Sequence, residues 1–120
     1  MDRLLAALMA ISAWSHAAVE PSEQAMRRAF AADLADGVRA AVAYVAQSGG
    51  EEALARMHAA RTDEFEVRAV RKIACRAEEN GPGHRCTFVV EVVTVAGPIE
   101  RAIAGRFYPG PHGLAFADDA

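Results

Sequence analysis

The chain has 120 residues, a formal net charge of −3 and two cysteines. A chain of this length forms one domain with a modest core, and the small acidic excess argues against a general nucleic-acid binder, which usually carries a basic excess. The sequence contains no metal-ligand spacing, phosphate-binding glycine loop or nucleophile elbow, so we expect no metal, no cofactor and no catalytic residue.

Residues Met1–Ala17 have the pattern of a secretory signal peptide. Arg3 supplies a weak positive start, Leu4–Trp14 is apolar, and small residues stand at the −3 and −1 positions of a cleavage site after Ala17. The apolar segment has 11 residues, well below the roughly 20 needed to cross a bilayer, so we expect no stable membrane anchor. The pattern predicts export of residues 18–120 as a single domain, periplasmic or secreted.

Two helices are expected next, a long one over about residues 23–47 and a short one over about 51–61. Ser22 is a plausible N-cap for the first. The Ser-Gly-Gly sequence at residues 48–50 ends it, and the same serine with Glu51 fits a capping box for the second. The long helix carries one apolar stripe at three- and four-residue spacing, formed by Met26, Phe30, Leu34, Val38, Ala41, Val42 and Val45.

The centre of the chain predicts a β-hairpin with strands over about residues 64–77 and 85–96. Apolar residues occupy mainly the odd positions of the first strand and the even positions of the second, which is typical of strands with one buried face. Pairing Cys75 with Cys86 places both apolar sets on one face. Two cysteines in an exported chain also predict one disulfide between them.

Two more strands, over about residues 99–108 and 113–117, follow turn signals rich in glycine and proline. They complete a four-stranded antiparallel meander. The fold class that we predict is therefore α+β, with one long N-terminal helix and a short second helix packed on this sheet in two layers.

The order of a helix, Phe65–Val67, Arg71–Cys75, a glycine-rich turn, Cys86–Phe88 and Arg106-Phe107 resembles small exported bacterial proteins, many of them similar to cystatin-like or NTF2-like domains. The resemblance covers about residues 22–117 and implies a helix on a curved antiparallel sheet. NTF2-like domains imply an alternative function, a ligand-binding or enzymatic pocket. A cystatin-like protease inhibitor comes third, because the Gln-x-Val-x-Gly hairpin of cystatins is not in the sequence.

Arg71 is the misfit of the expected hairpin, because the register places it on the core face opposite Val90. An unpaired buried guanidinium is costly, and Asp33 on the long helix is a conceivable partner in a pocket between helix and sheet. The alternative that we favour is a bulge near Val70 that turns Arg71 outward and Val70 inward. His84 lies in a Gly/Pro turn, where a solvated side chain is expected.

The outer face of the predicted sheet is the preferred candidate binding surface. Arg76 would lie opposite Arg85 there, and this like-charge pair would relax if an anion or partner were bound. Valines on this face have no evident cover, unless the short helix or the stems of basic side chains lie over them. We expect a binding or structural domain that contacts a protein partner or a second copy through Arg68, Lys72, Arg76, Arg85, Val89 and Val93.

Overall fold

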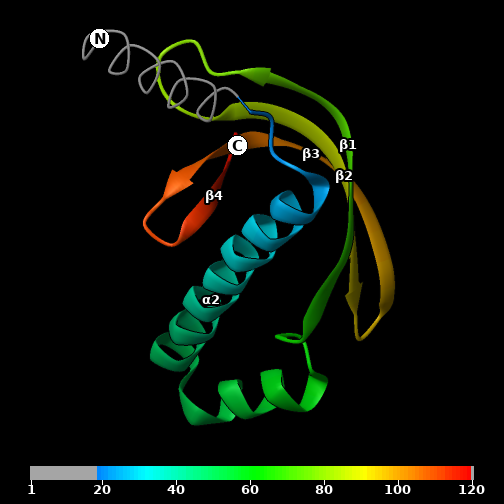
Figure 1. Ribbon diagram of the computed structural model, residues 1–120. Helices are drawn as coiled ribbons and strands as arrows, with labels where there is room; N and C mark the ends of the chain where they lie inside the picture. Colours follow the sequence, from blue (N-terminus) through cyan, green and yellow to red (C-terminus); the bar gives the residue numbers. More distant parts are fainter. Residues whose placement is uncertain (1–18, 120) are drawn as a thin grey trace, which may run out of the picture.

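The computed structural model describes residues 19–119, and the expected signal peptide lies outside them (Figure 1). The sheet order is β1-β2-β3-β4 with every neighbouring pair antiparallel, which confirms the predicted meander and the α+β class. The elements are α2 (Glu23–Ala60), β1 (Phe65–Ala77), β2 (His84–Thr94), β3 (Gly97–Gly110) and β4 (Gly113–Asp118).

Helix α2 is a single element of 38 residues with a kink at Gly50. The side-chain oxygen of Ser22 accepts a hydrogen bond from the backbone N–H of Ala25, as expected of an N-cap. Gly50 adopts φ 72° and ψ −169°, a conformation that glycine enters without steric cost. The expected separate second helix is therefore wrong. The break at residues 48–50 redirects the axis within α2, and the last turns lead back toward β1 (Figure 1).

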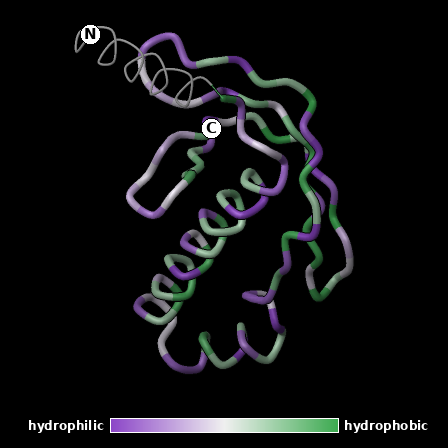
Figure 2. Tube along the Cα trace, viewed as in Figure 1, coloured by the Kyte–Doolittle hydropathy of each residue, from purple (hydrophilic) through white to green (hydrophobic). Residues whose placement is uncertain are grey.

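The core lies between the first turns of α2 and the inner face of the sheet. Phe30 of α2 meets Phe88 of β2 and Phe116 of β4. Phe107 of β3 packs against the same two rings, and all neighbouring ring centroids in this cluster are 4.9 to 5.8 Å apart. Such tilted and edge-to-face pairs add to the gain from burial. Met26 is completely buried beside them. Beyond Phe30 the residues of the apolar stripe of α2 are half-buried or exposed, although apolar and polar residues continue to alternate along the helix (Figure 2).

The predicted pairing of β1 with β2 is confirmed at Cys75–Cys86, which form the disulfide. Closing a loop of this size restricts the unfolded chain and stabilises the fold by about 2–3 kcal/mol. A disulfide is compatible with an oxidising compartment. Within residues 19–119, no helix is long and apolar enough to cross a membrane.

The register of β1 changes between Lys72 and Ala74 and again between Val67 and Ala69. The first irregularity makes Ile73 the extra residue of a bulge and reverses the alternation of side chains before it. Ile73 is 60% exposed as a result.

This change corrects the expected pairing of Arg71 with Val90. Val70 lies opposite Val90 and is buried, whereas Arg71 lies opposite Val89 on the outer face. The bulge that was the favoured alternative is present, and it begins slightly later in β1 than expected. The bulge is favourable because it buries the side chain of Val70 in place of the guanidinium group of Arg71.

Candidate binding surface

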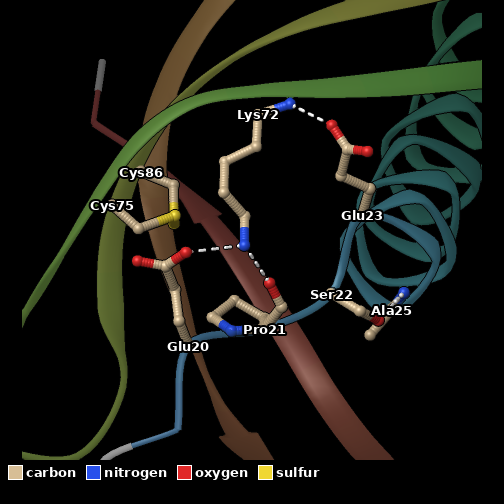
Figure 3. A network of polar contacts seen from close by, with 8 residues as sticks. All are labelled: Glu20, Pro21, Ser22, Glu23, Ala25, Lys72, Cys75 and Cys86. Atoms are coloured by element: carbon tan, nitrogen blue, oxygen red, sulfur yellow. Dashed lines mark hydrogen bonds and ion pairs between the residues drawn. A yellow bond between two sulfur atoms is a disulfide. The ribbon is translucent and has the colours of Figure 1, made fainter.

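Lys72 is the one residue of the expected surface that the bulge moves to the inner face, opposite Phe88. Its ammonium group donates to Oε2 of Glu20 at 2.7 Å and to the carbonyl oxygen of Pro21 at 2.6 Å. Its backbone N–H donates to Oε2 of Glu23 at 2.6 Å. These contacts connect β1 to the segment that leads into α2 (Figure 3). We name them the Lys72 network.

Within the Lys72 network, the ammonium group of Lys72 is paired with the carboxylate of Glu20. The hydrogen bond from Lys72 holds the pKa of Glu20 below its usual value. Lys72 is also largely covered, with a side chain that is 23% exposed. The network therefore stabilises the fold, and we no longer count Lys72 among the candidate binding residues.

Arg68, as expected, and Arg71, moved there by the bulge, lie on the outer face, and both are neutralised there. Arg68 pairs with Glu91 at 3.3 Å, and Arg71 pairs with Glu100 at 3.5 Å. The carboxylates come from β2 and β3, so these are cross-strand pairs of opposite charge, which stabilise a sheet modestly.

The structure does not bring Arg71 and Asp33 together. The pKa of Asp33 is raised by partial burial and by the nearby carboxylates of Asp36 and Asp118, whereas an arginine partner would lower it. Around Phe30 the space between helix and sheet is occupied by the phenylalanine cluster and Met26. The expected pocket at Arg71 and Asp33 is therefore not assembled.

Three arginines stand side by side across three neighbouring strands on the outer face. Arg76 of β1 lies opposite Arg85 of β2, as expected, and Arg85 lies opposite Arg106 of β3. We name these three residues the arginine row. Neighbouring strands are about 4.8 Å apart, so like charges at opposed positions repel one another.

The chain neutralises the arginine row only at its centre. Arg85 donates to Oε1 of Glu78 at 3.3 Å and to Oδ1 of Asp119 at 2.5 Å, and these hydrogen bonds raise the pKa of its guanidinium further. Arg106 stacks over the ring of Tyr108 at 4.7 Å. Arg76 has no hydrogen bond or ion pair to any of residues 19–119. Both flanking arginines therefore lack a carboxylate.

A hollow of about 330 Å³ lies beside Arg76 and Arg85 of the arginine row. Its floor carries the small side chains of Ala74, Thr87 and Ala104, and Asp119 enters it to reach Arg85. Small side chains leave the guanidinium groups accessible from outside. The two valines of the expected surface, Val89 and Val93, are half-buried farther along β2, so the apolar part of this surface is smaller than expected.

Comparison of the chain with protein families, curated proteins and solved structures finds no match. Among residues 19–119 there is also no group of three or more His, Cys, Asp or Glu side chains placed to hold a metal ion. The candidate site is therefore defined by the geometry of the chain alone.

Proposed function

We propose that the protein is an exported domain that binds an acidic segment of a partner protein at the arginine row. The observation that carries the proposal is the distribution of charge along the row. Arg85 has two carboxylate partners from its own chain, whereas Arg76 and Arg106 on either side have none within residues 19–119. A partner that supplies carboxylates to the flanks relieves the repulsion between opposed arginines.

Asp119 supports the choice of a carboxylate as the group that is bound. Its side chain reaches Arg85 through the hollow beside the row. Hydrogen bonds between guanidinium and carboxylate are charge-assisted and directional. A partner's Asp or Glu side chain at Arg76 or Arg106 would repeat the contact that Asp119 already makes. A shallow hollow with a floor of small side chains suits an extended peptide better than an enclosed small molecule.

Export is part of the same proposal. The signal-peptide pattern of Met1–Ala17 and the Cys75–Cys86 disulfide support a periplasmic or secreted protein. We also propose that the domain is similar to cystatin-like or NTF2-like domains, and the support for this is the helix packed on a four-stranded antiparallel sheet. We propose a binding domain without enzymatic activity.

The test is a titration of the ¹⁵N-labelled protein with a tetraglutamate peptide, followed by NMR, with tetraglutamine as the uncharged control. We expect saturable shifts at the amides of Ala74, Thr87 and Ala104. The double variant Arg76→Gln/Arg106→Gln is expected to bind about tenfold more weakly, which corresponds to about 1.4 kcal/mol.

Arg28→Gln provides a control for this titration that removes one positive charge away from the row. Arg28 is exposed on α2 and has no ion pair within residues 19–119, so its loss changes the net charge without touching the row. An equal loss of affinity in this variant would show general attraction between opposite charges and would reject the site. Sedimentation of the wild type and the double variant tests the other partner, a second copy of the chain.

A further inference from the structure

A cavity of about 680 Å³ lies on the inner side of the sheet, away from the arginine row. It is bounded by the segment before α2, the first turn of α2, the β1–β2 loop and the β3–β4 hairpin. Its volume lies within the roughly 300–1,000 Å³ of sites that take small molecules. Most of its wall is apolar, including Val19, Pro82, Phe107, Pro109 and Leu114.

His84 is the polar side chain that stands out in this wall. It is 6% exposed and is the one buried polar residue within residues 19–119. Its ladder position lies between Ala77 of β1 and Phe107 of β3, on the inner face. The expectation of a solvated turn residue is wrong, because β2 begins at His84 and the alternation of the strand turns it inward.

The imidazole of His84 makes no hydrogen bond to any of residues 19–119. The ring nitrogens of His84 are not among the fully enclosed unpaired side-chain atoms of residues 19–119, so they open onto the cavity that His84 lines. An imidazole without a partner in the protein, open to an apolar cavity, is placed to hydrogen-bond a polar group of a ligand.

The charges beside this cavity cancel. Glu20 lines it, and the carboxylate of Glu20 is paired with the ammonium group of Lys72 at 2.7 Å. Lys72 is held further by the carbonyl oxygen of Pro21. Among the residues that line the cavity, Glu20 is the only Asp, Glu, Lys or Arg, and it is already paired, so a charged head group would lose its hydration without a carboxylate, ammonium or guanidinium group to replace it, whereas a neutral one incurs a smaller desolvation penalty.

We propose that the cavity binds a small neutral molecule with an apolar body and one hydroxyl group, and that His84 hydrogen-bonds to this hydroxyl. A hydroxyl both donates and accepts, so it pairs with the imidazole whichever ring nitrogen carries the proton. The apolar body fills the space between Phe107 and Leu114. This site is separate from the arginine row, and neither proposal depends on the other.

Three probes with the same body separate the contribution of the head group: 4-propylphenol, propylbenzene and 4-propylbenzoate. Each is titrated into the full-length, disulfide-bonded protein and followed by NMR. We expect saturable binding of 4-propylphenol, with shifts of the His84 ring nitrogens. Propylbenzene is expected to bind roughly three- to tenfold more weakly, the ratio that corresponds to one hydrogen bond. The benzoate is expected to bind more weakly as well.

Variants assign the effect to His84. His84→Phe keeps a ring of similar size and is expected to bring 4-propylphenol down to the affinity of propylbenzene. His58→Phe is the control, because His58 is exposed near the end of α2, and it should leave both affinities unchanged. Ala25→Trp places a large side chain in the cavity wall and should abolish binding of both probes. Thermal melts establish that each variant is folded. If His84→Phe does not fold, the shifts of the His84 ring nitrogens in the wild type decide whether His84 contacts the ligand.

Four results would overturn the proposal. The first is propylbenzene or 4-propylbenzoate binding as tightly as 4-propylphenol. The second is a saturated complex in which the His84 ring nitrogens have not shifted. The third is no saturable binding of any probe. The fourth is a set of nuclear Overhauser effects, without ligand, from Leu114 to residues 1–18 or to a second copy, since the chain itself would then fill the cavity.

Discussion

Lys72 and Arg76 lie four residues apart on β1, where a regular strand would place them on the same face. The bulge at Ile73 puts them on opposite faces. Lys72 contacts two residues of the segment that leads into α2 and the first residue of α2, whereas Arg76 has no hydrogen-bond or ion-pair partner within residues 19–119. The comparison separates two roles of a positive charge: one paired inside the chain stabilises the fold, and one left unpaired in a row of like charges is available to a partner.

The largest difference in stability between the inner and outer faces of the sheet is expected from Phe88→Ala. Phe88 is completely buried, and its ring contacts the rings of Phe30, Phe107 and Phe116. Its truncation should lower the free energy of unfolding by about 3–5 kcal/mol, measured by urea denaturation. Thr87→Ala, the neighbouring residue on the outer face, is the control and should cost less than about 0.5 kcal/mol. Similar losses in the two variants would contradict the division between inner and outer faces.

The disulfide joins β1 to β2 between the Lys72 network and the arginine row. Cys75→Ala/Cys86→Ala should lower the free energy of unfolding by about 2–3 kcal/mol, because the unfolded chain regains the freedom of the closed loop. Denaturation of the wild type in the presence of reductant should reproduce the loss. A loss with reductant but none in the double variant would contradict this explanation.

The Lys72 network should make stability depend on pH in a defined direction. The pKa of Glu20 is lower in the folded chain than its usual value, so its contribution is present above that value and is lost as the pH falls through the lowered pKa. Lys72→Met should lower the melting temperature at pH 7, and the difference from the wild type should shrink at pH 3.

Arg56→Gln is the control for this pH series. It breaks the exposed pair of Arg56 with Glu52 on α2, and exposed pairs contribute little. A difference between Lys72→Met and the wild type that stays constant from pH 7 to pH 3 would contradict the assignment to Glu20.

The smallest expected effect distinguishes a carboxylate site from a merely basic patch. Asp119→Asn removes one of the two carboxylates of Arg85 and should tighten tetraglutamate binding by about two- to threefold, since the peptide no longer competes with Asp119. Asp36→Asn removes the same charge from an exposed position on α2 and serves as the control. An equal gain in both variants would indicate that only the net charge matters.

The sequence was sufficient to predict the sheet because its signals are local. Strand alternation, turn residues and the two cysteines together predict the meander and the pairing of Cys75 with Cys86. The bulge at Ile73 was harder to locate, because apolar residues stand at both odd and even positions near Val70. The choice between them depends on what packs against β1, which includes the contacts of Lys72 with the segment before α2.

The candidate site was predicted only in part, for the same reason. Arg76 and Arg85 follow from the cysteine pairing, but Arg106 joins them through the register of β2 with β3, which turn signals alone do not define. The burial of His84 depends on where β2 begins, and boundaries are the least predictable property of a strand. The kink at Gly50 likewise could not be told from a helix end, because glycine is common at both.

The most direct test of binding at the arginine row compares tetraglutamate affinity in the wild type, Arg76→Gln/Arg106→Gln and Arg28→Gln. We expect about a tenfold loss in the double variant, an affinity within about twofold of the wild type in the single one, and shifts centred on Ala74, Thr87 and Ala104. Unchanged affinity in the double variant, or shifts centred on another part of the chain, would show that the arginine row is not where the protein meets an acidic partner.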